Sequence, residues 1–422
     1  MAAIPQENPS DEPNGGRGRL YAVLGGLYLA QGIPTYLLLV ALPPLMRDAG
    51  ASRTAIGLFS LLMLPLVLKF VAAPFVDRIS PLARLGHRRG WVIPTQLLVS
   101  ALIASMAFFD PSRAGPLFGL GLAIAVLSSL QDIATDGYAV RHLDGVSRPV
   151  GNAIQAGAIA LGVVLGGTLA LVLFDRIGWT ATILIVATLS LLPLPAALWM
   201  REIAEEGRRL PGRPRATLRG FFTRPNAWIV LGFALTYRAS EGLVRGMEGA
   251  FLVDLGLPVA WIGYLSGGAA ATAGMVGAVV SAFLIRRAGL TTALVVLGGL
   301  RTVCFLVFTL SAAHVLSSPL VAMGASAFQA FIRYMELVAL YSLFMRSSSN
   351  DQPGTDFTIL TCAELVVYLL GSSIAGVIAD RLGYAPLFGI ATLVSCAGIG
   401  LAYRQLVRLD RRNAAAGEDQ IP

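Results

Sequence analysis

Two acidic side chains lie inside an apolar stretch of the chain, where they could bind and release a proton. Asp132 and Asp136 belong to the segment Gln131–Tyr138, which interrupts an apolar run from about residue 116 to residue 140. A spacing of four residues puts both carboxylates on one face of a helix. Because an ionisable group in an apolar environment is costly unless it serves a polar cavity, we expect this face to line a cavity that a polar solute visits.

A second apolar run, 226–253, carries four charged residues of alternating sign. Arg238, Glu241, Arg245 and Glu248 are spaced so that they lie within an arc of about 80° on a continuous helix. Four charges cannot face lipid, so we expect them to face the protein interior or an aqueous cavity. For Arg238 and Glu241 we favour the cavity. For Arg245 and Glu248, mutual neutralisation is an equal alternative.

Further charged residues lie in three later apolar runs. Arg333 and Glu336 are one helical turn apart, and Tyr341 follows them on the same run. Arg301 and Glu364 each stand alone in an apolar run. A lone charge at membrane depth usually has a partner on another helix, so for these two residues we favour pairing over direct contact with a solute.

These residues could couple proton movement to the movement of a solute. Desolvation favours the protonated form of a carboxylic acid, and a nearby arginine favours the ionised form. The candidate proton-binding residues are Asp132, as the first candidate, then Glu241 and Glu336, with Asp136 beside them. Arg238 and Arg333 could act as switchable partners or could bind an anionic group of the solute. The candidate solute-binding residues are Gln31, Gln131, Arg238, Arg333, Tyr341 and Glu364.

Gln31 is a candidate because of the residues that follow it. Gly32 and then Pro34 interrupt the hydrogen-bond ladder of a helix, and such a break can expose backbone carbonyls to a cavity. The alternative is a kink that serves packing alone.

Four residues around the end of the second apolar run are candidate gating residues: Lys69, Asp77, Arg78 and Arg88. We favour a latch in which Asp77 and the arginines bind neighbouring helix ends; the alternative is that they only determine topology. For Lys69 we favour a side chain that extends to the membrane interface, with gating as the alternative.

The composition is that of a polytopic membrane protein. Of 422 residues, 55% are hydrophobic and 13% are charged, a balance that soluble domains do not need. The net charge of +8 could indicate a nucleic-acid partner. The basic residues lie mainly in short segments between apolar runs, however, where they determine topology. We therefore expect a lipid bilayer around the protein and no nucleic-acid partner.

Twelve apolar runs each approach the ~20 residues that a helix needs to cross a bilayer. They are residues 20–45, 53–75, 90–109, 114–140, 150–174, 179–200, 226–253, 258–285, 290–312, 318–345, 357–379 and 384–406. The chain is thus predicted to have a disordered cytoplasmic tail (1–19), an N-terminal six-helix half (20–200), a cytoplasmic linker (201–224), a C-terminal six-helix half (225–406) and a second cytoplasmic tail (407–422).

Arginine and lysine are unevenly distributed between the two sides of the membrane. With the N-terminus in the cytoplasm, 22 of the 32 lie in or next to cytoplasmic segments and 5 lie in the opposite loops. Since positive charge is enriched on the cytoplasmic side, we expect both termini there. The large excess of arginine over Lys69, the only lysine, is typical of a GC-rich bacterial genome and favours a bacterial inner membrane.

Two short motifs recur at almost the same shift. Residues 55–60 resemble 261–266 at a shift of 206, and residues 174–179 resemble 379–384 at a shift of 205. The repeat predicts an all-α membrane protein of two parallel six-helix halves. At this shift Glu336 corresponds to Gln131, so we expect Glu336 to face Gln131 across a central cavity.

Three stretches resemble the AmpG-like branch of the major facilitator superfamily. They are Ala55–Ser60 continuing to Leu68–Arg78, then His87–Trp91, then Gln131–Asp136. The last, Gln-Asp-Ile-x-x-Asp, is the most specific, and the resemblance covers nearly the whole chain. It implies alternating access by a rocker-switch motion and, for bacterial importers, dependence on the proton gradient. It marks Gln131, Asp132 and Asp136 for the central path.

The resemblance leaves two cargoes open. The branch contains permeases for anhydro-muropeptides, permeases for ferric siderophores of the rhizobactin and pyochelin type, and eukaryotic acetyl-CoA transporters. This chain has short loops and twelve predicted spans, which differs from typical muropeptide permeases. We therefore expect a proton-coupled symporter that imports a ferric siderophore, and hence a role in iron transport. The alternative is an anhydro-muropeptide permease of cell-wall recycling.

A membrane-embedded enzyme is the rival class. An enzyme gathers its nucleophile, base or metal ligands at one place, whereas the ionisable groups here are spread over several runs without an HExxH or GxSxG motif. Lys69 follows no glycine-rich phosphate loop, and Cys304, Cys362 and Cys396 lack metal-site spacing. We expect no enzyme activity, no cofactor and no metal. The expected partners are a small-molecule solute and protons, and the expected state is a monomer.

Overall fold

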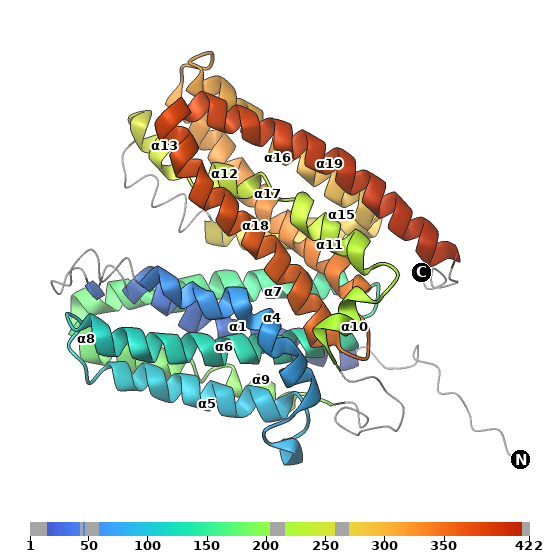
Figure 1. Ribbon diagram of the computed structural model, residues 1–422. Coiled ribbons are helices and arrows are strands. Elements are labelled where there is room, and N and C mark those ends of the chain that lie inside the picture. Colours follow the sequence, from blue (N-terminus) through green and yellow to red (C-terminus); the bar gives the residue numbers. More distant parts are fainter. Residues whose placement is uncertain (1–14, 43–44, 47–58, 203–215, 258–269, 416–422) are drawn as a thin grey trace, which may run out of the picture.

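The computed structural model describes residues 15–42, 45–46, 59–202, 216–257 and 270–415, and every regular element among them is a helix (Figure 1). The N-terminal half contains α1 (Gly15–Tyr36), η2 (Leu37–Ala41), η3 (Phe59–Met63), α4 (Leu64–Arg78), η4 (Ala83–Leu85), α5 (Arg89–Met106), α6 (Ala114–His142), α7 (Arg148–Gly162), η5 (Val163–Thr168), α8 (Leu169–Leu189) and α9 (Leu194–Trp199). The C-terminal half contains α10 (Leu218–Phe222), α11 (Ala227–Thr236), α12 (Glu241–Arg245), α13 (Glu248–Asp254), α15 (Ala270–Ala288), α16 (Leu290–Ala312), α17 (Pro319–Ser347), α18 (Pro353–Leu382) and α19 (Tyr384–Ala415).

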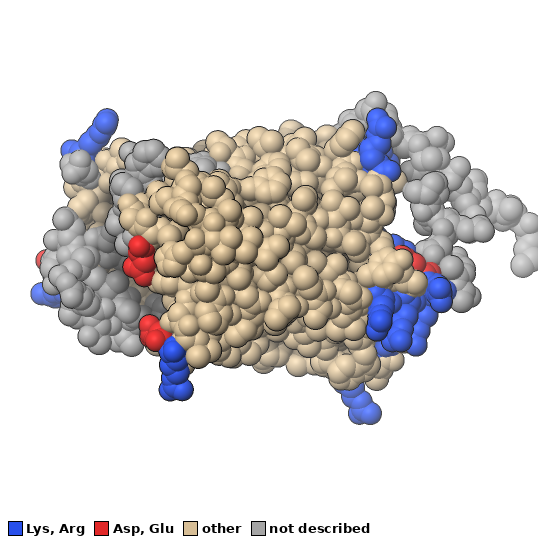
Figure 2. All heavy atoms as spheres, turned by 90° about the horizontal axis from the view of Figure 1, so that it is seen from above, with Lys and Arg blue, Asp and Glu red and all other residues tan. Residues whose placement is uncertain are grey.

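The surface of these helices is apolar over most of their length. Seven of the described helical spans, of 23 to 30 residues, are long and apolar enough to cross a membrane. Leucines point outward from them: Leu370 on α18 is 58% exposed and Leu393 on α19 is 71% exposed. Figure 2 shows an uncharged middle with Lys and Arg gathered towards the two ends. Only lipid solvates such a belt, so the chain is a multi-pass membrane protein.

The described helices fit the twelve-helix layout that the sequence predicts, with six spans in each half. Run 226–253 differs from the expectation of one continuous helix, because it is divided into α11, α12 and α13. The buried guanidinium of Arg301 donates a hydrogen bond of 2.7 Å to the carbonyl of Tyr237, at the end of α11. A helix can end inside the membrane when a side chain binds its last carbonyls, as here.

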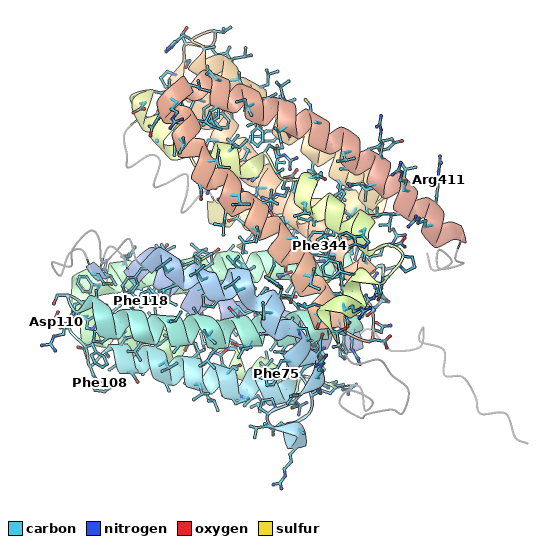
Figure 3. The ribbon with its side chains drawn as sticks, in the orientation of Figure 1. Phe75, Phe108, Asp110, Phe118, Phe344 and Arg411 are labelled. Atoms are coloured by element: carbon cyan, nitrogen blue, oxygen red, sulfur yellow. The ribbon has the colours of Figure 1, made fainter. Side chains whose placement is uncertain are left out.

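The two halves pack against each other at the end of the molecule where α1 begins and α19 ends, called here the terminal end, and diverge at the other end (Figure 1). One apolar cluster at the terminal end combines residues of both halves, for example Tyr28, Ala134, Val338 and Phe344. Phe344 lies where the halves approach each other (Figure 3). Towards the opposite end each half has an apolar cluster of its own. A continuous apolar core therefore joins the two halves at the terminal end but not at the opposite end.

The boundaries of the polar segments differ from the sequence-based ones. α1 begins at Gly15, so the last residues of the predicted tail 1–19 are helical, and α19 extends to Ala415, well into the predicted tail 407–422. The predicted linker 201–224 contains the short helix α10. Residues 1–14, 203–215 and 416–422 lie outside the described residues.

The glycine of the second repeated motif has a similar backbone conformation in both halves. Gly178 has φ 75° and ψ −179°, and Gly383 has φ 86° and ψ 175°. Positive φ at equivalent glycines explains why glycine occurs in both copies. The first motif lies almost wholly outside the described residues.

α1 and α7 are in backbone contact where Gly32, near the end of α1, meets Gly162, the last residue of α7. A Cβ atom added at Gly162 would lie 2.6 Å from the Cα atom of Gly32, closer than any side chain can approach. A Cβ atom added at Gly157, on the same helix, would meet no atom within 4 Å. Glycine at 162 therefore sets the distance between the two helices.

We predict that Gly162→Val destabilises the protein by about 1–3 kcal/mol through overpacking, whereas Gly157→Val has a much smaller effect. The midpoint of thermal unfolding in detergent measures both variants. Equal midpoints for the two variants would contradict the close helix contact.

Candidate functional site

A cavity of about 260 Å³ lies between the two halves. α1, α4, α6 and α7 line it from the N-terminal half, and α17 and α18 line it from the C-terminal half. Polar residues that line it include Gln31, Thr35, Lys69, Ser128, Ser129, Asp132, Asp136, Gln155, Tyr341, Thr361 and Glu364. The expectation that the face of Asp132 and Asp136 borders a cavity thus agrees with the structure.

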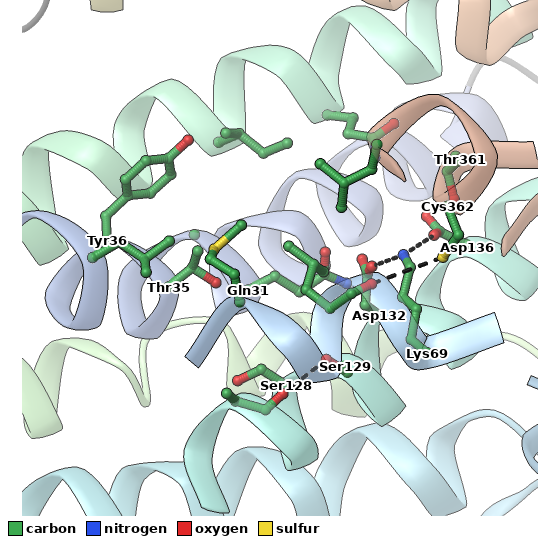
Figure 4. Close-up of a pocket in the computed structure, with 18 of the residues that line it drawn as sticks. Gln31, Thr35, Tyr36, Lys69, Ser128, Ser129, Asp132, Asp136, Thr361 and Cys362 are labelled. Atoms are coloured by element: carbon green, nitrogen blue, oxygen red, sulfur yellow. Dashed lines mark hydrogen bonds and ion pairs between the residues drawn. The ribbon is translucent and has the colours of Figure 1, made fainter. Parts of the chain in front are cut away.

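Lys69 lies between the two aspartates in this cavity (Figure 4). Its ammonium group forms an ion pair with Asp132 and lies 3.7 Å from the carboxylate of Asp136. The hydroxyl of Tyr28 donates to Asp136 at 3.2 Å. Lys69 is only 8% exposed, so the interpretation that its side chain extends to the membrane interface is wrong. The reason is that two buried carboxylates provide a partner inside the protein.

Gln131 does not belong to this cavity, although it precedes Asp132 in the chain. Its side chain is fully buried and donates a hydrogen bond of 2.7 Å to Gln96 on α5. A residue next to Asp132 points about 100° away from it around the helix, here into the N-terminal half. The prediction that Gln131 contacts a solute is therefore not supported by its position.

The buried charges of the C-terminal half form a separate network. Three arginines face three glutamates within it. The pairs are Arg238–Glu364 at 2.6 Å, Arg301–Glu336 at 2.8 Å, Arg333–Glu241 at 2.9 Å, Arg238–Glu241 at 3.6 Å and Arg238–Glu336 at 3.8 Å. Gln329 and Tyr237 donate further hydrogen bonds to Glu241 and Glu336. The formal charges of these six residues sum to zero.

This network corrects three sequence-based expectations. Arg238, Arg333 and Glu336 are absent from the lining of the cavity, because each is bound to a charge within its own half. Glu336 therefore does not face Gln131 across the cavity. Glu364 and Tyr341 do line it, and Glu364 also contacts Arg238, so it belongs to both places.

The four charges along 226–253 do not form one row. Arg238 and Glu241 belong to the network, and Arg245 and Glu248 form a separate pair. Arg245 pairs with its neighbour Glu248 at 3.0 Å, and Glu248 also accepts a hydrogen bond from Ser326. Mutual neutralisation is thus the better interpretation of this pair. Glu241, for which we favoured the cavity, instead binds Arg333.

At the terminal end, Asp77 connects the two halves. One of its oxygens accepts from Arg88 at 2.6 Å, and the other accepts from the backbone N–H and the hydroxyl of Thr355, both at 2.7 Å. Thr355 lies in the first turn of α18, where free N–H groups and the helix dipole favour a carboxylate. Arg78 donates to the carbonyl of Ala216. The expected latch geometry is therefore present, and Thr355 is the partner that sequence reasoning missed.

A second carboxylate binds the first turn of α5. Glu202 accepts hydrogen bonds from the backbone N–H groups of His87 and Arg89. Burial lowers the pKa of His87 to about 4, so this side chain is neutral at pH 7 and adds no positive charge beside Arg88. The segment that leaves the N-terminal half is thus bound to α5.

We predict that Asp77→Ala destabilises the protein by about 3–5 kcal/mol, because it leaves Arg88 buried next to the end of α18 without this carboxylate. Thermal unfolding in detergent measures the loss. Adding Arg88→Met to Asp77→Ala should restore part of it. Asp110→Asn, in an exposed loop, is the control, and a single Asp77 variant as stable as this control would refute the interaction.

Comparison with known protein families gives a match over most of the chain. Residues 24–363 match the model of the Major Facilitator Superfamily. The chain is 28% identical over 404 residues to the anhydromuropeptide permease of Escherichia coli K12, which covers 93% of this chain and 81% of that protein. It is 25% identical over 362 residues to a putative transporter, AmpG 2, of Rickettsia bellii, with coverage of 82% and 87%.

Solved structures show the same fold at low sequence identity. A bacterial homologue of the iron transporter ferroportin, in an outward-facing state, superposes with a TM-score of 0.67 at 19% identity, over 93% of this chain and 99% of that one. The transporter FucP in the outward conformation gives a TM-score of 0.65 at 12% identity, over 92% and 97%.

Proposed function

Because the chain belongs to the Major Facilitator Superfamily, we propose that it is a proton-coupled importer of anhydro-muropeptides in a bacterial inner membrane. The cargo is taken from the Escherichia coli relative, an anhydromuropeptide permease that aligns with 93% of this chain. We further propose that the protein has no enzyme activity and that both termini are cytoplasmic, as the arginine distribution favours.

The preference for a ferric siderophore, drawn from the short loops of the chain, has no support among the relatives. Loop length reports little about the central cavity, because loops lie outside the membrane and vary independently of it. The ferroportin homologue shares 19% identity and supports the fold alone. The anhydro-muropeptide, formerly the alternative, is therefore the proposed cargo.

The observation that carries the proton-coupling proposal is the charge count of the triad Lys69–Asp132–Asp136. One ammonium and two carboxylates leave one uncompensated negative charge in the cavity. A proton on either aspartate makes the triad neutral, and this lowers the cost of enclosing it in the membrane. Asp132 or Asp136 would accept the proton, and Lys69 would remain with the other carboxylate.

The arrangement of the halves indicates where the cavity faces. The shared apolar core and the contacts of Asp77 close the terminal end. With the termini in the cytoplasm, this is a cytoplasm-closed state, which can receive cargo and a proton from the periplasm. Transport then requires that the contacts of Asp77 break, so Asp77, Arg78 and Arg88 are the proposed gating residues. Gln31, Tyr341 and Glu364 are the proposed cargo contacts within the cavity.

We predict that Asp132→Asn lowers proton-driven uptake at least about tenfold but preserves counterflow exchange, since it removes a proton-binding group and leaves the cavity shape intact. Uptake of a labelled anhydro-muropeptide into proteoliposomes, with and without a pH gradient, measures both activities. Asp110→Asn serves as the control. Undiminished uphill uptake by Asp132→Asn would exclude this residue as the proton carrier.

The cargo itself is tested on the unmodified protein. We expect excess unlabelled anhydro-muropeptide to inhibit uptake of the label and a ferric siderophore to have no effect. Uptake of the siderophore, without uptake of the muropeptide, would reject the proposed cargo.

A further inference from the structure

Three polar atoms in the wall of the cavity have no hydrogen-bond partner within the part of the chain that the structure describes. They are the amide nitrogen of Gln31, the hydroxyl of Ser128 and the amide oxygen of Gln155. Ser128 is 8% exposed and Gln155 is 5% exposed. A buried polar group without a partner is destabilising, and natural proteins rarely retain one unless something binds it. All three come from the N-terminal half, on α1, α6 and α7 respectively.

The chemistry of these atoms defines what they can bind. Gln31 offers an N–H donor, Gln155 offers a carbonyl acceptor, and the hydroxyl of Ser128 can do either. Hydroxyl and secondary amide groups, which both donate and accept, can satisfy such atoms. None of the three side chains is charged.

The neighbouring charges argue against an ionic partner. Ser128 precedes Asp132 by one helical turn, so an anion bound to it would lie close to the two aspartates. A cation would compete with Lys69 for these acids instead of binding the neutral groups. Figure 4 shows Gln31 and Thr35 on one side of the cavity, and Lys69 with both aspartates further along it.

We propose that Gln31, Ser128 and Gln155 form a subsite that binds uncharged hydroxyl or amide groups of the cargo. The inference rests on the proposed function, because it takes the cargo to be an anhydro-muropeptide. Such a molecule carries hydroxyl and amide groups on its sugars and amide groups in its peptide. Cargo bound here lies one helical turn from the carboxylate of Asp132, next to the group that binds the proton.

The adjacent residue supplies a matched control. Ser129 lines the same cavity, but its hydroxyl already donates to the carbonyl of Ala125 at 2.8 Å. Ser128→Ala and Ser129→Ala therefore remove the same atom from neighbouring positions. Only Ser128 has its hydroxyl proton available to donate to cargo. Gln155→Leu is a second variant, which removes the whole amide, including the unpartnered acceptor, and leaves an apolar side chain of similar size.

The experiment measures the affinity of the purified full-length protein for three probes: the anhydro-disaccharide, the anhydro-disaccharide tripeptide and the free tripeptide. We expect Ser128→Ala and Gln155→Leu to weaken binding about 3- to 10-fold, the effect of one lost hydrogen bond, and Ser129→Ala to change it less than about twofold. Weakening for both sugar-containing probes places the bound group on the sugar. Weakening for the two peptide-containing probes places it on the peptide.

A stability measurement separates binding from folding. Without cargo, Ser128→Ala and Gln155→Leu should melt at or above the wild-type temperature, because each removes an unpartnered buried atom. A merely structural role would lower both midpoints. Wild-type affinity of both variants for every bound probe would overturn the subsite alone. Failure of the wild-type protein to bind any probe would overturn the proposed function and the subsite together.

Discussion

The cost of placing a charge in hydrocarbon determines most of the interior of this protein. Neither lipid nor an apolar core solvates an ion, so each buried ionisable group needs an opposite charge or a polar cavity. The network described in the C-terminal half meets this requirement, with three arginines and three glutamates that pair among themselves. The N-terminal half does not, because Lys69 faces both Asp132 and Asp136. The unmatched charge of this triad lies in the cavity between the two halves.

We propose that this asymmetry gives the two halves different roles in transport. The network of three arginines and three glutamates has no net charge and needs no counter-charge from the cavity. The C-terminal half therefore contributes a wall of constant charge to the cavity. The N-terminal half contributes the triad that we propose to bind the proton, and also the three cavity-lining polar atoms without partners among the described residues. α18 connects the wall to the closed end: Thr355 in its first turn binds Asp77, and Thr361 and Glu364 line the cavity further along the same helix.

The sequence predicted the architecture correctly, but it did not predict which side chains pair with one another across helices. Hydropathy, charge distribution and the repeat at Gly178 and Gly383 are properties of single segments, and they predicted the two-half layout correctly. Lys69, Glu336 and Gln131 were misplaced because their positions depend on which face of a helix meets which neighbour. Spacing alone could have placed Tyr28 on the same helix face as Gln31, because Tyr28 lies about one turn before Gln31 on the same run. No local signal indicated that Glu202 or Thr355 would bind a distant helix end.

In the connection between the halves, a residue bound to the N-terminal half directly precedes a residue bound to the C-terminal half. Glu202 is bound to the start of α5, and the carbonyl of Ala216 is bound to Arg78, so both ends of the intervening segment are fastened to the N-terminal half. The next residue, Thr217, exchanges hydrogen bonds with Gln352 of the C-terminal half. With these hydrogen bonds intact, a single peptide unit, between Ala216 and Thr217, separates the part of the chain bound to the N-terminal half from the part bound to the C-terminal half. Rotation of one half relative to the other must therefore change the backbone torsions at this peptide unit or first break the hydrogen bonds of Ala216 or of Thr217.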